Sequence, residues 1–416
     1  MQAPSKARRS RPAGSSSGAG PANGASGERS RGRRFPQPRD PAGEGQVLYA
    51  ALDLGTNNCR LMIATLHNSQ FKIVEAFSRI VRLGEGLSAS GRLDERAMER
   101  ALRALKICAE KIEKRGVTRI RAVATQACRM ARNGRDFIAR VERETGLRLT
   151  IISPEEEARL SVMGCASLLD GEGLTPKPRA ALVMDVGGGS TELSWVELAA
   201  APGKRTDLKA SRIMPRPRFW ISLPVGVVTL AERFPEPERG DTRAWFESMI
   251  TDVVERLKDF SDADSFRDAF DCGEAYIVGT SGAITSLAGM HLRLDRYDRS
   301  RVDGLWMQQS QCQDVIARLL DLGRSGRELE PCIGRDRADL VLAGAAILEA
   351  VQRLWPCQSL RVADRGLREG LLLSMARKRP RRRRGRGGGK SRAAEQTQNG
   401  QAQNSQAQKR APEDAL

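Results

Sequence analysis

The stretch LVMDVGGGSTEL, residues 182–193, decides the fold, because an earlier stretch, AALDLGTNNCRL at residues 50–61, repeats its design. Each is an apolar run that ends in an acid and continues into Gly and small hydroxyl or amide residues. The two acids, Asp53 and Asp185, lie 132 residues apart, which is about the length of one domain. The repeat therefore predicts two equivalent strand-loop-strand units on two domains, whose loops face one another and hold phosphate.

The two ends of the chain differ in composition from the part between them. Residues 1–46 are rich in Ser, Gly, Ala, Pro and Arg, and residues 377–416 begin with RKRPRRRRGRGGGK and continue into a Gln-rich tail. Both lack the bulky apolar residues that build a core, so we expect both to be disordered. They carry net charges of +6 and +9, which leaves +3 of the chain's +18 for residues 47–376. The tails are either solvated appendages or binding segments for a polyanion such as polyphosphate, RNA or an anionic membrane surface.

The N-terminus and the cysteines indicate where the protein is located and whether it binds zinc. The N-terminus lacks an apolar signal core, and no stretch approaches the roughly 18 uninterrupted apolar residues of a spanning helix. We therefore expect a cytoplasmic protein. The eight cysteines are scattered, with no C-x-x-C pair, which favours buried, reduced thiols over a zinc site.

Strands and helices alternate between the tails, which is typical of α/β architecture. In the first half we expect strands at 47–54, 60–66, 71–83, 119–125 and 147–153, and helices at 94–115, at 133–146 and from Pro154. The second half repeats this order, with strands at 181–186, 192–198, 218–224, 274–280 and 359–364 and helices that include 242–260, 338–354 and 365–378. The predicted domains are residues 47–176 and 177–376.

This duplicated order resembles the actin-like (ribonuclease H-like) fold, which actin, sugar kinases and the large heat-shock chaperones share, with two domains around a central cleft. Within that superfamily five pieces are similar to one branch, the exopolyphosphatase/guanosine pentaphosphate phosphohydrolase (Ppx/GppA) family. The five pieces, in chain order, are LDLGTNNCRLMI, ATQACRMA, IISPEEEARL, VMDVGGGSTEL and VGTSGAITSLAG. The resemblance covers residues 47–376.

The Gly-rich loops are the predicted phosphate sites. In the first loop Gly55 allows a tight turn and close approach of the backbone, although an ordinary hairpin turn has the same composition. The other predicted donors of the first loop are Thr56, Asn57 and Asn58. Three consecutive glycines weaken a regular strand, so close approach to a ligand explains the second loop better. The second loop contributes Gly187, Gly188, Gly189, Ser190 and Thr191.

Two further pieces are candidate phosphate contacts. The turn made of Gly279, Thr280, Ser281 and Gly282 is either a third anion site or a plain strand-to-helix connection. Arg129 matches, by resemblance, a phosphate-contacting Arg of the family, and its guanidinium can bind phosphate bidentately.

The acids supply the chemistry. Glu155, Glu156 and Glu157 begin a helix, where carboxylates suit the helix dipole, but successive helical positions point about 100° apart, so we expect one of the three to face the cleft. The resemblance assigns the catalytic base to Glu157 and assistance with water and metal to Glu192.

Asp53 and Asp185 end apolar strands, and buried acids are costly unless they are paired or bind metal. They either hold Mg²⁺ against phosphate or cap the loop backbone.

The chain departs from the family in two respects. Long members carry an additional helical domain of His/Asp phosphohydrolase type, whereas this sequence holds two histidines, His67 and His291, so we expect the short, two-domain form. Cys59 and Arg60 stand where the family often has an aromatic residue and a His, which leaves the substrate preference open.

These observations predict a Mg²⁺-dependent phosphoanhydride hydrolase that releases the terminal phosphate of inorganic polyphosphate, of guanosine pentaphosphate (pppGpp), or of both. One alternative is an ATP-dependent kinase or ATPase of the same superfold. Another is a non-catalytic polyanion-binding protein that acts through its Arg-rich tail. A homodimer is an expectation from resemblance alone.

Overall fold

The structure is a computed structural model, and it describes residues 47–67, 70–198, 215–238, 240–258 and 267–377. All of these residues fall within one unit, residues 1–378. The expected disorder of the two tails concerns residues outside the described ranges, apart from Arg377, which ends the last helix.

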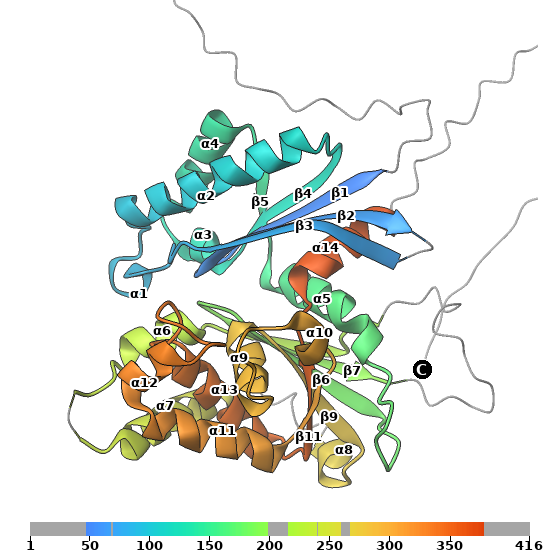
Figure 1. The fold of residues 1–416 in the computed structure, drawn as a ribbon, viewed down its shortest axis with the longest axis vertical. Coiled ribbons are helices and arrows are strands. Elements are labelled where there is room, and N and C mark those ends of the chain that lie inside the picture. The colour runs from blue at the N-terminus through green and yellow to red at the C-terminus, as the bar shows by residue number, and fades with distance from the viewer. Residues whose placement is uncertain (1–46, 68–69, 199–214, 239, 259–266, 378–416) are drawn as a thin grey trace, which may run out of the picture. The chain divides into compact units, whose positions relative to one another are not determined.

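The first half of the chain folds around a five-stranded sheet of order β3-β2-β1-β4-β5 (Figure 1). Its strands are β1 (Leu48–Leu54), β2 (Asn58–His67), β3 (Gln70–Ile80), β4 (Arg119–Ala124) and β5 (Leu149–Ile151). β1, β2 and β3 pair antiparallel as a meander, and β4 and β5 continue from β1 in parallel.

The second half repeats this order in a six-stranded sheet, β10-β11-β9-β6-β7-β8. Its strands are β6 (Ala180–Val186), β7 (Thr191–Glu197), β8 (Phe219–Leu223), β9 (Ala275–Thr280), β10 (Trp306–Gln308) and β11 (Ser359–Ala363). β6 to β9 and β11 reproduce the pairing of the first sheet, and β10 adds an antiparallel edge. The predicted duplication is therefore present strand by strand.

The helices of the first half are α1 (Leu87–Ser90), α2 (Glu95–Lys114), α3 (Gln126–Met130), α4 (Gly134–Thr145) and α5 (Pro154–Cys165), followed by a 3-10 turn (Ala166–Leu168). Those of the second half are α6 (Val227–Arg233), α7 (Thr242–Lys258), α8 (Arg267–Asp271), α9 (Gly282–His291), α10 (Arg299–Val302), α11 (Gln309–Asp321), α12 (Gly323–Leu329), α13 (Val341–Leu354) and α14 (Leu367–Arg377). The sequence analysis did not foresee α11. The helix expected from residue 338 begins at Val341, after a run of turns.

Alternation along β1 decides which side chains reach the centre of the molecule. Ala50, Leu52 and Leu54 pack in one cluster with the buried face of α2, whereas Tyr49 and Ala51 pack in another with side chains of α5 and α14. Figure 1 shows α2 and α4 over one face of this sheet and α14 with α5 on the other. Because successive strand residues point to opposite faces, Asp53 points to the same side as Tyr49 and Ala51.

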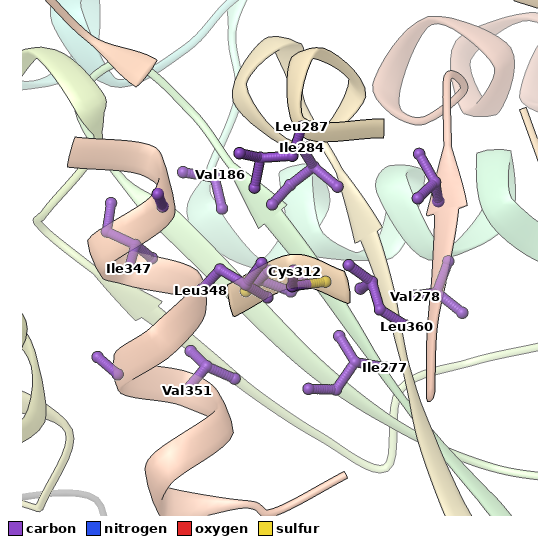
Figure 2. Close-up of a cluster of buried hydrophobic side chains, with 14 of the residues drawn as sticks. Val186, Ile277, Val278, Ile284, Leu287, Cys312, Ile347, Leu348, Val351 and Leu360 are labelled. Atoms are coloured by element: carbon purple, nitrogen blue, oxygen red, sulfur yellow. The ribbon is translucent and has the colours of Figure 1, made fainter. Parts of the chain in front are cut away.

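The second sheet is covered by apolar helices. Eleven of the fourteen residues of α13 are buried, so this helix lies in a core. Figure 2 shows Ile347, Leu348 and Val351 of α13 in the same buried cluster as the strand residues Ile277 and Leu360. Val186, the last residue of β6 before the second loop, belongs to the same cluster.

Two helices pack across the division that the sequence suggests. α14 follows the last strand of the second half, yet its Leu371 and Leu372 pack on the first sheet. α5 follows the first sheet, yet its Val162 and Cys165 belong to the core of the second. The two helices approach so closely that a Cβ at Gly370 would lie 2.0 Å from the carbonyl oxygen of Leu160. The boundary predicted between residues 176 and 177 stays a prediction, because these helices tie both halves together.

Two expectations from the sequence concern the state of the cysteines and the presence of membrane-spanning helices. All eight cysteines lie within the described residues and are free, and only Cys272 is exposed. None of the described helices is both long enough and apolar enough to cross a membrane. The cytoplasmic location stays a prediction.

Candidate active site

A cleft of about 680 Å³ lies where the two Gly-rich loops meet, and both sheets line it. Fifteen residues predicted as site residues line it: Asp53, Gly55, Thr56, Asn57, Asn58, Glu157, Asp185, Gly187, Gly188, Gly189, Ser190, Glu192, Thr280, Ser281 and Gly282. Arg129, Thr191 and Gly279 do not line it. The hydroxyl of Thr191 instead donates to the carbonyl oxygen of Val225 at 2.7 Å, and Gly279 packs against Leu360 and Ile284.

The two loops are built alike. The N–H of Gly55 donates to the carbonyl oxygen of Asn58 at 2.9 Å, and that of Gly187 donates to the carbonyl oxygen of Ser190 at 2.8 Å. Each loop is thus a short turn between antiparallel strands, with its Asp at the end of the incoming strand. The resemblance between the two sequence stretches therefore corresponds to one local structure formed twice.

The loops also touch each other, which explains the run of glycines. A Cβ at Gly188 would lie 3.0 Å from the backbone nitrogen of Asn57, and one at Gly189 would lie 2.8 Å from Oγ1 of Thr56. Side chains at these positions would push the loops apart. By contrast, a Cβ at Gly55 would meet no atom closer than 3.5 Å beyond its chain neighbours, so contact within the empty fold does not require this glycine. The sequence analysis explained the glycines of the second loop by close approach to a ligand. The structure shows that they also allow close approach to the first loop.

Strand pairing places charged residues opposite one another on neighbouring strands, once in each sheet. Asp185 on β6 lies opposite Glu192 on β7, and Glu192 lies opposite Ser222 on β8. Oγ of Ser222 donates to Oε1 of Glu192 at 2.9 Å. Asp53 on β1 lies opposite Arg60 on β2 in the same way.

Burial dominates the titration of these acids. It raises the pKa of Asp53 to about 6, although Arg60 and Arg368 act in the opposite direction. It raises the pKa of Glu192 to about 7, and the neighbouring Asp185 adds to the shift. Acids that titrate near neutral pH inside a cleft are typical of functional sites.

Of the three glutamates that begin α5, only Glu157 lines the cleft. Ser153 caps the helix by accepting from the N–H of Glu156 at 3.2 Å. The carboxylate of Glu156 pairs with Arg121 and Arg159, and Glu155 is exposed. Glu157 is 8% exposed, as the 100° step along the helix predicts for one inward position.

Arg129 lies behind Glu157 rather than on the cleft wall. Its Nη1 donates to Oε2 of Glu157 at 3.1 Å and to the carbonyl oxygen of Ile152 at 2.8 Å. Burial, and next the charge of Glu192, raise the pKa of Glu157 well above its usual range, whereas Arg129 opposes the rise. In this structure Arg129 orients a carboxylate, and the phosphate contact inferred for it from resemblance stays a prediction.

Ser161 is a site residue that the sequence analysis missed. It lies one helical turn after Glu157 on α5, is 1% exposed, and donates from Oγ to Oδ2 of Asp185. The spacing of four residues from Glu157 is the signal that points to it, because positions four apart share a helix face. α5 therefore supplies one carboxylate of the site and orients another.

Comparison with known proteins places this chain. A family model described as the Ppx/GppA phosphatase family matches residues 62–379. The chain belongs to the Ppx/GppA phosphatase family. The matched range contains Glu157, Glu192 and the second loop, and it begins just after the first loop.

Solved structures of similar proteins confirm the actin-like, two-domain α/β fold of this Ppx/GppA family member. A family member from Aquifex aeolicus is 28% identical, with a TM-score of 0.61, and the match covers 80% of this chain and 98% of that one. An exopolyphosphatase-like protein is 29% identical, with a TM-score of 0.66 and coverage of 79% and 97%. An exopolyphosphatase from Cytophaga hutchinsonii, at 23% identity, 79% and 97% coverage and a TM-score of 0.66, shares the fold.

Two acids of this Ppx/GppA protein are the residues that could hold a magnesium ion, which stays a prediction. Burial is the largest cause of the raised pKa of both Asp53 and Asp185, and the charge of Asp185 adds to the rise at Asp53. Oδ1 of Asp53 is buried and has no hydrogen-bond partner among the described residues. Mg²⁺ usually takes one or two carboxylates and completes its shell with water and substrate phosphates.

Arginines supply positive charge to the same cleft. Arg60, Arg337 and Arg368 line it, and within the described part of the chain none of their guanidinium groups forms an ion pair or hydrogen bond. Burial, and next the charge of Arg60, lower the pKa of Arg368. Like charges that stay unpaired in a half-buried position favour an anionic ligand, which would relieve their repulsion.

Proposed function

We propose that this Ppx/GppA family member hydrolyses the terminal phosphoanhydride bond of inorganic polyphosphate, of guanosine pentaphosphate, or of both. The observation that carries the proposal is Glu157, a buried carboxylate that lines the cleft between the two Gly-rich loops and is held by Arg129. Both candidate substrates end in the same phosphoryl group, so the loops by themselves do not select between them.

Glu157 acts in this proposal as the general base. It accepts a proton from a water molecule whose oxygen forms a bond to the terminal phosphorus, while the bridging P–O bond breaks and the shortened chain leaves. Burial raises the pKa of Glu157, and a carboxylate with a raised pKa is a stronger base than an ordinary one. The cation of Arg129 keeps the carboxylate oriented and opposes its protonation.

The loops and arginines hold the phosphate chain. Backbone N–H groups of both turns and the hydroxyls of Thr56 and Ser190 offer donors at the centre of the cleft, and Arg60 and Arg368 balance the charge of phosphate groups. Ser281 already caps α9 by accepting from the N–H groups of Ala283 and Ile284 at 3.1 Å, so the third Gly-rich turn contributes less.

Magnesium completes the proposal. Asp53 and Asp185 would hold the ion, with Glu192 and Ser161 beside them. When bound, the ion neutralises charge that develops on the phosphate oxygens. The protein's own part is to keep two carboxylates at the junction of the loops.

Replacement of Glu157 tests the proposed function. We expect Glu157→Gln to fold normally and to release phosphate about 10²–10⁴-fold more slowly, which is the usual contribution of a general base. Glu155→Gln, an exposed position two residues earlier, is the matched control and should keep full activity. Phosphate release is measured from long-chain polyphosphate, guanosine pentaphosphate and ATP, each with and without magnesium. Wild-type turnover by Glu157→Gln, or a wild-type protein that hydrolyses only ATP, would contradict the proposal.

A further inference from the structure

Gln126 is a buried polar residue of the cleft with no assigned role. It is the first residue of α3, directly after β4 and Thr125, and its side chain lines the cleft. The residue is 9% exposed, and its Oε1 is fully buried without a hydrogen-bond partner among the described residues. A buried, unsatisfied amide oxygen costs about 1–3 kcal/mol, so the empty fold gains nothing from the polarity of this side chain.

The amide of Gln126 reaches the junction of the two loops. The position that a Cβ on Gly189 would occupy lies 2.0 Å from Oε1 of Gln126 and 2.8 Å from Oγ1 of Thr56. One turn further along α3, Arg129 holds Glu157. A single short helix thus presents an amide to the loops and a guanidinium to the carboxylate.

A second buried glutamine shows why position matters. Both amide atoms of Gln352 on α13 also lack partners among the described residues, but Gln352 belongs to the core of the second half and does not line the cleft. Gln126 differs because a ligand that enters the cleft can reach its amide. The amide nitrogen and oxygen exchange places by rotation about the last side-chain bond, so this group can present its N–H to an anion.

We propose that Gln126 is a substrate-contacting residue, whose amide N–H donates to a non-bridging oxygen of the phosphate group held between the two loops. The inference rests on the proposed function for its setting, since it assumes a phosphate chain in this cleft. It adds a side-chain amide to the backbone N–H groups, hydroxyls and arginines already proposed as donors. A neutral amide also tolerates the metal and the carboxylates nearby, which another cation or anion would disturb.

Binding of inorganic tripolyphosphate tests the contact independently of turnover. Isothermal titration calorimetry with magnesium present would compare the wild type with Gln126→Met, which keeps the shape but removes the donor. We expect the Kd to rise about 10-fold, equivalent to about 1.4 kcal/mol, with an unchanged or higher melting temperature because the unsatisfied amide is gone. Gln126→Glu, of equal size, should weaken binding further by repelling phosphate. Gln352→Met is the control and should bind as the wild type does.

The outcomes separate this inference from the proposed function. Wild-type affinity in Gln126→Met, or no binding of tripolyphosphate by the wild type, would overturn the contact. Weaker binding in both Gln126 variants, in a protein that releases phosphate from none of the substrates, would keep the contact and refute the hydrolase. Should Gln126→Met fail to fold, Gln126→Glu alone decides, because equal affinity in that variant is incompatible with a phosphate contact.

Discussion

Neutralising Glu192 should stabilise the metal-free protein at high pH while it damages the site. Glu192 is 2% exposed and lies between Asp185 and Ser222. A carboxylate buried beside another carboxylate is a functional arrangement that costs stability. Glu192→Gln keeps the size of the side chain and an oxygen that can accept from Ser222, and it removes the charge.

The size of the effect follows from the pKa. Folding raises the pKa of Glu192 from an ordinary value of 4.5 to about 7, chiefly by burial. The folded state therefore binds the proton more tightly, so this group favours folding below pH 4.5 and loses that contribution as the pH rises through 7. At 1.36 kcal/mol per pKa unit, the ionised carboxylate costs the folded state roughly 3 kcal/mol above pH 7.

Urea denaturation in chelator-containing buffer measures this cost. We expect Glu192→Gln and the wild type to unfold with similar free energies near pH 4.5, and the variant to be more stable by about 2–3 kcal/mol at pH 8. Glu197→Gln on the same strand is the control, because its side chain is 58% exposed and its surface ion pair should change the free energy by less than about 1 kcal/mol. A stability difference that does not grow with pH, or a variant less stable than the wild type at pH 8, would refute the reasoning.

Two further predictions concern groups that support the site. Arg129→Met should move the acidic limb of the pH profile of kcat/KM to higher pH, because Arg129 lowers the pKa of Glu157; a limb that stays in place would contradict this role. Gly226→Ala should lower kcat/KM by roughly 10–100-fold, because its Cβ would lie 2.5 Å from backbone atoms of Gly187, Gly188 and Gly189 and would displace the second loop. Gly55→Ala is the control and should have the melting temperature of the wild type, because its Cβ would meet no atom closer than 3.5 Å beyond its chain neighbours. Equal activity of the wild type and Gly226→Ala would show that the loop does not move.

Local patterns in the sequence predicted most of the fold. The apolar period of α2, with Ala97, Ala101 and Leu105 on its buried face, and the repeated strand-loop-strand units depend on neighbours in the chain, so they are readable without a structure. Asn133 lies at the N-cap position of α4, but its side chain does not cap the helix, because its amide accepts from the N–H of Leu93 and donates to the carbonyl oxygen of Leu93. That partner lies 40 residues away, and short-range propensity carries no information about it.

The parts of the site that escaped prediction depend on packing between distant elements. The assignment of Arg129 to phosphate rested on its motif, whereas its ion pair with Glu157 depends on how α3 meets α5. Ser161 and Gln126 were overlooked because Ser and Gln are common on helices, and their significance appears only when Asp185 and Gly189 are found beside them. The exchange of α5 and α14 between the sheets has no local sequence signal at all.

On the proposed function, the duplication explains how one cleft can both bind phosphate and activate water. The acids at the strand ends correspond, Asp53 to Asp185, and the residue opposite each acid lies seven positions later on the returning strand. In the first half that residue is Arg60, and in the second it is Glu192. One copy of the motif therefore presents a cation to the cleft and the other a carboxylate, and α5 adds Glu157 on the carboxylate side. On the proposed function, divergence at this single equivalent position supplies an arginine for phosphate from the first half and a carboxylate beside the proposed metal site from the second.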